Sequence, residues 1–443
     1  MKSRKVFACL LTLILTLQIF SFSSLAANEK VYKFKELSYI VLENDTVQIV
    51  KYDGEKKSYT VPGKIDGMAV TVIGSHAFSG CPDLETLVIP GSVRDLKECA
   101  ISYCPKLKTV TVKEGSLKTV DPMDIYSCRK LTTLSLPKNV AEFSFLYDCN
   151  EVKQVTFNSK NPYYKSYEGV VYSKDLKTLV YYPPGKENTY FIVSSTVDII
   201  TRTAFNHAKN LEGIYIPKTV KEIGETAFGY TSVVIYYEGS KTPNALDAAF
   251  YPWAVVHNAS ALAEPKTLKS SKTDTDEITL KWSKVDGATG YRVFIYDKET
   301  KSYEAVGNTT KTSYKISGLD SNTSYKFAVK AYAKTVSGNV WADENAKLTV
   351  CTLPDTPTLS LSQDDGVVML KWNKIQGVTG YVVYYSESKN GTYKKLATTK
   401  NTSYKATKLD EDETYYFKVR AYTKTSDGNI YSAYSSVKAV TVK

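Results

Sequence analysis

A repeated spacing of apolar residues is the feature that most limits how this chain can fold. Between residues 73 and 157 the order is Ala-Phe, two residues, Cys, two residues, Leu, two residues, then two aliphatic residues separated by one residue. The order returns between 204 and 228, which predicts stacked copies of one short unit. The repeat positions in successive units are Ala77, Phe78, Cys81, Leu84, Leu87 and Ile89; Ala100, Ile101, Cys104, Leu107, Val110 and Val112; Ile125, Cys128, Leu131, Leu134 and Leu136; Leu146, Cys149, Val152, Val155 and Phe157; and Ala204, Phe205, Ala208, Leu211, Ile214 and Ile216.

This spacing predicts a solenoid. Each unit contains a short strand in which two apolar residues, such as Leu87 and Ile89, point to the same side. One unit alone cannot bury that side, so neighbouring units must stack on each other. We expect the Ala-Phe-x-x-Cys segment to form the opposite wall as one helical turn. A proline after the strand, as at Pro90, ends the ladder of hydrogen bonds.

The repeats resemble the BspA-like leucine-rich repeats of bacterial surface proteins. The resemblance covers approximately residues 30–250. It implies an opening hairpin over 39–52 and a longer inserted unit over 161–185. Two units depart from the family pattern, because Asp124-Ile125 and Phe145-Leu146 stand where Ala-Phe is expected. We expect weaker packing at these two units within the same fold.

A second repeat, with a period of 90 residues, begins at residue 263. Within each copy apolar and polar residues alternate, which is typical of half-buried strands. The strand-B tryptophan and the leucine followed six residues later by a corner tyrosine resemble fibronectin type III modules. The matching positions are Trp282 and Trp372, Leu319 and Leu409, and the structural tyrosines Tyr325 and Tyr415.

These two repeats together predict a mainly β, multidomain chain. We expect a leucine-rich repeat solenoid of short strands with helical turns over 27–262, and immunoglobulin-like β-sandwiches over 263–353 and 354–443. Residues 1–26 have the basic start, apolar middle and small residues near the end that are typical of a signal peptide. Since no second apolar span follows, we expect an exported protein without a membrane span.

Net charge is concentrated in the C-terminal modules. The whole chain has 57 basic and 46 acidic residues, whereas 263–353 has 14 and 11 and 354–443 has 13 and 9. Lysine-rich solvent faces of sandwiches explain this excess, and they also deter pairing at strand edges. Attraction to an anionic cell-wall polymer is the alternative. No recognition motif for nucleic acid is present, so we expect no such partner.

Four cysteines occupy one position of the repeat. Cys81, Cys104, Cys128 and Cys149 are predicted to form a buried column of thiols, because a small apolar side chain fits there and Ala208 replaces cysteine in a later unit. Disulfides between coils and, less readily, a metal site are the alternatives. We expect no cofactor and no metal.

The predicted binding surface is the outer face of the solenoid strands. Threonines recur at one outward position, and the neighbouring outward column ends in Tyr215. Hydroxyls on strands are common without any ligand. Hydroxyls beside aromatic rings also suit a glycan or an extended protein segment. The candidate contact residues are Thr86, Thr109, Thr133, Thr178, Tyr163, Tyr164 and Tyr215.

No catalytic constellation is evident in the sequence. The chain has three histidines, of which His76 and His207 adjoin Ala-Phe pairs and suit structural roles. No nucleophile-elbow, zinc-protease or phosphate-loop motif is present. We therefore predict a non-enzymatic exported binding protein that adheres to a host or neighbouring-cell protein or glycan. An accessory carbohydrate-binding protein of a hydrolase system and a wall-associated structural protein are the alternatives.

Overall fold

The computed structural model describes residues 30–241 and 255–443. The predicted signal peptide, 1–26, lies outside these residues. The chain divides into two compact units after Ala259, slightly before the expected domain end at 262. The second unit begins at Ser260, whose hydroxyl donates a hydrogen bond to Asp343 in the first sandwich.

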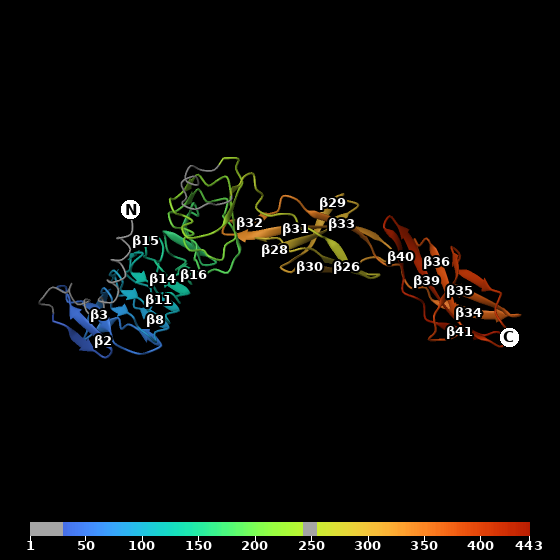
Figure 1. The fold of residues 1–443 in the computed structure, drawn as a ribbon, viewed down its shortest axis with the longest axis horizontal. Helices are drawn as coiled ribbons and strands as arrows, with labels where there is room; N and C mark the ends of the chain where they lie inside the picture. Colours follow the sequence, from blue (N-terminus) through green and yellow to red (C-terminus); the bar gives the residue numbers. More distant parts are fainter. Residues whose placement is uncertain (1–29, 242–254) are drawn as a thin grey trace, which may run out of the picture. The chain divides into compact units, whose positions relative to one another are not determined.

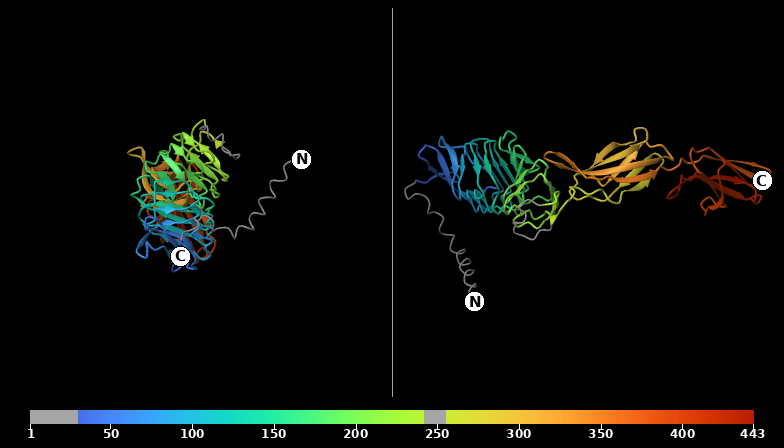
Figure 2. Two further views of the ribbon diagram at one scale, coloured as in Figure 1. Left: turned by 90° about the vertical axis from the view of Figure 1, so that its left-hand side faces the viewer. Right: turned by 90° about the horizontal axis from the view of Figure 1, so that it is seen from above.

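Each coil of the solenoid is built from short strands on successive sides. Parallel pairing stacks these strands (Figures 1 and 2). The pairing is in register, as in Val110 between Leu87 and Leu134, and these leucine and valine side chains are buried in the interior. The longest sheet of the first coils consists of β4 (Ser58–Thr60), β8 (Thr86–Ile89), β11 (Thr109–Val112), β14 (Thr133–Leu136) and β16 (Gln154–Phe157).

Two further rows of strands complete these coils. The row over the Ala-Phe positions is β7 (Phe78–Ser79), β10 (Ile101–Ser102) and β13 (Ile125–Tyr126). The remaining side holds β9 (Asp95–Leu96), β12 (Thr119–Val120) and β15 (Glu142–Phe143). The N-terminal end is closed by β1 (Tyr32–Phe34), β2 (Leu37–Val41), β3 (Val47–Tyr52), β5 (Lys64–Ile65) and β6 (Met68–Ile73).

The inserted unit starts a second block of coils. An antiparallel meander leads back into parallel stacking. One sheet contains β17 (Tyr164–Tyr167), β18 (Val170–Ser173), β19 (Thr178–Tyr181), β21 (Ile199–Ile200) and β23 (Glu222–Ile223). The other contains β20 (Tyr190–Ile192), β22 (Gly213–Ile216), β24 (Val234–Tyr237) and β25 (Val255–Val256).

The expected helical turns are wrong, because the described residues contain no helix. The Ala-Phe-x-x-Cys segments are two-residue strands or turns whose backbone N–H groups bond to the next coil, as from Phe78 to the carbonyl of Ala100 at 2.8 Å. Left-handed residues bracket these segments, so i-to-i−4 helical bonds cannot form. The left-handed residues that precede the segments have φ of 56° to 62° and are His76, Cys99, Thr203 and Thr226.

The two sandwiches repeat one set of internal contacts. The first contains β26 (Lys269–Thr273), β27 (Glu277–Lys281), β28 (Gly290–Asp297), β29 (Ser302–Thr309), β30 (Ser313–Ser317), β31 (Ser324–Thr335), β32 (Gly338–Trp341) and β33 (Ala346–Cys351). The second contains β34 (Leu359–Asp364), β35 (Val367–Trp372), β36 (Gly380–Ser386), β37 (Lys394–Thr399), β38 (Ser403–Ala406), β39 (Thr414–Thr425), β40 (Gly428–Tyr431) and β41 (Lys438–Thr441).

Matching aromatic residues fix the same corners in both sandwiches. The tryptophans Trp282 and Trp372 are buried, each with its ring edge-on to a tyrosine at 5.3 and 5.4 Å. The Tyr325 hydroxyl accepts a hydrogen bond from the backbone N–H of Asp320 at 2.8 Å, and that of Tyr415 accepts one from Asp410 at 3.2 Å. These bonds make the tyrosine corner that the sequence spacing predicts.

Because each sandwich has its own core, we expect each module to unfold separately. Trp372→Ala should destabilise the second sandwich by about 3–5 kcal/mol, since it removes a buried aromatic side chain and leaves a cavity. Differential scanning calorimetry of the mature chain should show one transition moving down while the solenoid transition stays in place. Trp282→Ala is the matched control for the first sandwich. A shift of all transitions together contradicts independent unfolding.

Asp124 occupies the alanine position of the repeat and is buried. Burial raises the pKa of Asp124 from 3.8 to about 7, although its carboxylate accepts a hydrogen bond from the backbone N–H of Asp121. The folded state therefore favours the protonated carboxyl. Its stability falls as pH rises from about 4, where the unfolded chain ionises, to about 7, where the folded chain ionises too.

Asp124→Ala restores the repeat residue and should stabilise the solenoid above pH 7. The gain in melting temperature over the parent should be larger at about pH 8 than at about pH 5, because the cost of burying a charge is present only at the higher pH. Thermal unfolding followed by circular dichroism measures the melting temperatures of the variant and the parent at the two pH values. A gain that does not change with pH means that the Asp124 carboxyl is not the cause.

Candidate binding site

A ridge of turn residues runs along one edge of the solenoid, between the Phe and Cys positions of each repeat. The second residue of each turn has a left-handed backbone with φ between 51° and 64°. Bonds from coil to coil hold this strained backbone, for example from the Tyr103 N–H to the carbonyl of Tyr126 at 3.1 Å. The turn ridge consists of Ser79–Gly80, Ser102–Tyr103, Tyr126–Ser127, Tyr147–Asp148, Asn206–His207 and Gly229–Tyr230.

Aromatic side chains are concentrated on the turn ridge. Tyr103, Tyr147 and Tyr230 are among the most exposed large side chains of the described residues, at 53%, 51% and 69%. Tyr126 joins the first two, with ring centroids 5.3 Å from Tyr103 and 5.5 Å from Tyr147. The Tyr230 ring is stacked on His207 at 4.7 Å. The ridge therefore presents two aromatic groups to solvent.

The turn ridge is interrupted by the coil that contains Tyr182. The Tyr182 ring stacks on Phe205 at 5.2 Å and its N–H bonds to the carbonyl of Ala204, so Tyr182 takes the Phe position of the repeat. The following Pro183–Gly185 is buried instead of forming an exposed turn. Gly185 is required there, because a Cβ would lie 2.3 Å from the Glu151 carbonyl oxygen.

This interruption forms a pocket of about 310 Å³. The floor includes Tyr181 and Pro184, and the walls belong to the neighbouring turns of the ridge. An ion pair of 2.6 Å between Lys209 and Glu151 links the coils on the two sides of the interruption. The lining residues are Arg129, Phe145, Leu146, Tyr147, Asp148, Asn150, Tyr181, Pro184, Asn206, His207 and Tyr230.

Asp148 is the fixed polar group of the pocket. Its Oδ2 accepts hydrogen bonds from the Ser127 hydroxyl at 2.7 Å and from Arg129 Nε at 2.9 Å. Burial raises the pKa of Asp148, but these bonds outweigh burial and leave the pKa below its ordinary value. Burial lowers the pKa of His207, so the imidazole is neutral at pH 7. The pocket thus holds one paired cation and anion and a neutral imidazole.

Three of the four predicted threonines lie in one column. Thr109 pairs with Thr86 on one side and with Thr133 on the other, and all three are half-buried. Gln154 follows Thr133 in that column. Placing Thr178 there is wrong, since β19 lies in another sheet, where Thr178 pairs with Ile199. The inserted unit changes the order of the strands, which the repeat spacing alone does not reveal.

The predicted tyrosine contacts separate into three cases. Tyr163 is 52% exposed. Tyr164 is half-buried and serves the fold, because its hydroxyl accepts a hydrogen bond from the Phe143 N–H and donates to the carbonyl of Ala141 at 3.1 Å. Tyr215 is buried in β22, which pairs with β20 and β24, so it does not extend the second outward column. A ligand role for Thr86, Thr109, Thr133 and Tyr163 stays a prediction.

Sequence reasoning missed the turn ridge. Its signal is present at the two variable positions before each cysteine, which hold tyrosine in Tyr103, Tyr126 and Tyr147 and again in Tyr230. These positions look like unconstrained loop residues when only the apolar pattern is followed. The stacking of coils brings them together into one row.

The four repeat cysteines are buried as free thiols. Three of the thiols donate a hydrogen bond to a backbone carbonyl of the preceding coil, at the Phe position of its repeat. The distance from Sγ to the carbonyl oxygen is 3.2 Å for Cys104 to Phe78 and 3.7–3.8 Å for Cys149 and Cys128. Thr231 occupies the same position in a later coil, and its hydroxyl donates to the Phe205 carbonyl at 2.6 Å. The position therefore accepts a small side chain, and where that side chain is cysteine or threonine it can add a hydrogen bond to the preceding coil. Burial raises the pKa of Cys149 to about 12, which makes its thiol unreactive.

Two variants of similar shape test this role of the cysteine position. Cys104→Thr should retain the bond to the Phe78 carbonyl, whereas Cys104→Val removes the donor and should cost about 1 kcal/mol more in the free energy of unfolding. Urea denaturation of the solenoid measures the difference. Equal stability of the two variants contradicts a hydrogen-bonding role.

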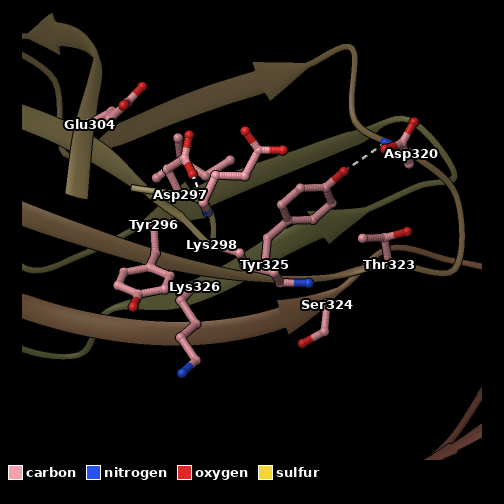
Figure 3. Close-up of a pocket in the computed structure, with 11 residues that line it drawn as sticks. Tyr296, Asp297, Lys298, Glu304, Asp320, Thr323, Ser324, Tyr325 and Lys326 are labelled. Atoms are coloured by element: carbon pink, nitrogen blue, oxygen red, sulfur yellow. Dashed lines mark hydrogen bonds between the residues drawn. The ribbon is translucent and has the colours of Figure 1, made fainter. Parts of the chain in front are cut away.

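A second pocket, of about 580 Å³, lies in the first sandwich (Figure 3). Two of its polar side chains have structural roles within the module. Asp297 caps the turn after β28 by accepting bonds from the N–H groups of Glu299 and Thr300, and Tyr325 makes the corner bond to Asp320. In the described ranges, no group of three or more His, Cys, Asp or Glu side chains is placed to hold a metal ion. We assign no site to this pocket.

The fold and the ridge define a class of protein, an all-β repeat solenoid followed by two immunoglobulin-like sandwiches. Residues 65–180 and 184–254 match the BspA type leucine rich repeat region in six copies, and 263–344 and 354–438 match the fibronectin type III domain. The first match breaks off at residue 180, where the turn ridge is interrupted. The chain therefore carries a BspA-type leucine-rich repeat region and two fibronectin type III domains.

Curated relatives are matched over part of their length. Chitinase A1 of Niallia circulans is 33% identical over 42% of this chain and 26% of its own length. Human contactin-3 is 29% identical over 38% of this chain and 17% of its own length. The chain thus spans about a quarter or less of these relatives, and the chitinase similarity lies in the fibronectin type III region.

Solved structures with similar folds include proteins of both types. A leucine-rich repeat protein from Eubacterium ventriosum covers 53% of this chain and 80% of its own, at 16% identity and a TM-score of 0.32. A two-domain fibronectin type III segment of chicken tenascin covers 40% of this chain and 99% of its own, at 19% identity and a TM-score of 0.28. No helix in the described part of the chain is long and apolar enough to span a membrane.

Proposed function

We propose that the protein is an exported, non-enzymatic binding protein of the adhesion type. Its solenoid contacts a protein or a glycan of a host or neighbouring cell, and the two fibronectin type III domains serve as spacers. The observation that carries the proposal is the turn ridge, where Tyr103, Tyr147 and Tyr230 are exposed on a repeat scaffold. Exposed tyrosines combine a large apolar face with a polar tip, which suits them to binding surfaces.

The rigidity of the scaffold supports the same role. Adjacent coils bond through paired strands, as β7 with β10 and β8 with β11, and through the turns of the ridge, so the ridge residues are held at fixed separations before any ligand arrives. A surface that is ordered in advance loses less conformational entropy on binding. The strained left-handed residues of the ridge agree with this, because such strain is common where a surface is shaped for contact.

A second function has one observation in its favour. The fibronectin type III region is similar to chitinase A1, a chitinase by name, so an accessory carbohydrate-binding protein beside such enzymes is the alternative. The basic excess of 263–443 favours a third role, attachment to an anionic cell-wall polymer.

Two fragments test the proposal, because each compact unit has its own core. Residues 27–259 immobilised on beads should capture a partner from host matrix proteins or glycans, whereas 260–443 should not. Capture by 260–443 alone, released by salt, would instead indicate wall attachment through charge. Circular dichroism of both fragments, showing β structure and cooperative melting, is the control. Failure of both folded fragments to bind overturns the proposal.

A further inference from the structure

We propose that the pocket at the interruption of the turn ridge, together with the Tyr103–Tyr126–Tyr147 row beside it, binds an uncharged oligosaccharide. This inference rests on the proposed function, since it names the ligand class of the same surface. The pocket takes one part of the sugar chain, and the open tyrosine row contacts the part that continues along the ridge.

The first argument is the supply of aromatic surface. Tyr147 stands at the wall of the pocket and His207 with Tyr230 at the opposite wall. Sugar rings present faces of C–H groups that pack against aromatic rings, and the electron-rich ring face attracts these weakly positive hydrogens. The pocket lining therefore includes aromatic rings from the coils on both sides of the interruption.

The second argument is the kind of polar group between the aromatic rings. The Oδ2 atom of Asp148 accepts hydrogen bonds from Ser127 and Arg129, while its Oδ1 accepts a long one of 3.5 Å from the Asn150 amide. Asn206 and a neutral His207 complete the polar lining. Each sugar hydroxyl both donates and accepts a hydrogen bond, and this mixture of carboxylate, amides and imidazole offers both functions.

The charge balance of the lining favours a neutral ligand. Arg129 is the cation of the pocket and is paired with Asp148 at 2.9 Å. The imidazole of His207 carries no charge at neutral pH. An anionic polymer would have to compete with Asp148 for Arg129, and a cationic one would have to compete with Arg129 for Asp148. Neither conflict arises for an uncharged sugar.

The backbone of the ridge disfavours an extended peptide as the ligand. A peptide that adds to a sheet needs free N–H and C=O groups at an edge. Along the ridge these groups bond between coils, as from Ser127 to Tyr147 at 3.1 Å and from His207 to Gly229 at 2.9 Å. The volume of about 310 Å³ is at the low end of the range of about 300–1,000 Å³ for small-molecule sites, which suits one segment of a longer sugar chain.

The test is binding of the mature full chain to a glycan array and to two soluble probes, the β-1,4-linked hexamers of glucose and of N-acetylglucosamine. Isothermal titration calorimetry then compares variants. Tyr147→Ala should weaken binding about tenfold, and Tyr147→Phe should retain most of the affinity because the ring is kept. Tyr32→Ala, which changes an exposed tyrosine outside the ridge, is the matched control and should bind like the parent.

Salt and a second variant separate the outcomes. Binding of an uncharged sugar should persist in high salt, whereas binding of an anionic polymer should decline. Loss of binding in Tyr163→Ala with Tyr147→Ala unaffected would move the site to the inserted unit and overturn the inference. If no glycan binds but a host protein is captured by the solenoid fragment, the sugar ligand is wrong and the proposed function survives. If neither binds, both fall.

Discussion

The structure depends on one constraint, which is that each coil buries its apolar side chains only by stacking in register on the next. Val110 is buried because Leu87 and Leu134 lie directly beside it in the neighbouring strands. The same register aligns every other position of the repeat. The thiol positions, the strained turns and the exposed tyrosines therefore form rows as the coils stack. A surface of this kind is a by-product of how the interior is filled.

The coarse architecture could be predicted from the sequence because it follows from periodicity. Two aliphatic residues separated by one residue specify which side of a strand is buried, and tandem copies 90 residues apart specify two related sandwiches. The corner tyrosines Tyr325 and Tyr415 could be located because their partner lies a few residues away in the chain. Local spacing carries the information in each of these cases.

What could not be predicted depends on which strands become neighbours. The backbone of Ala-Phe-x-x-Cys was expected to be helical, yet left-handed turns such as those at His76 and Gly80 direct its hydrogen bonds to the next coil. Thr178 and Tyr215 were misplaced because the meander from β17 to β19 starts a new sheet. The pocket arises where Pro183–Gly185 is drawn inward, and its walls come from residues nearly a hundred positions apart.

The short inward path at Pro183–Gly185 has a consequence for how such chains can diversify. The strands of each coil pair with those of the neighbouring coils, so duplication of a coil before Tyr147 lengthens the aromatic row and leaves the residues that line the pocket unchanged. Duplication of a coil after Tyr230 alters neither the aromatic row nor the pocket. The depth of the recess and the length of the row are thus set by different coils, so that one can change while the other stays the same.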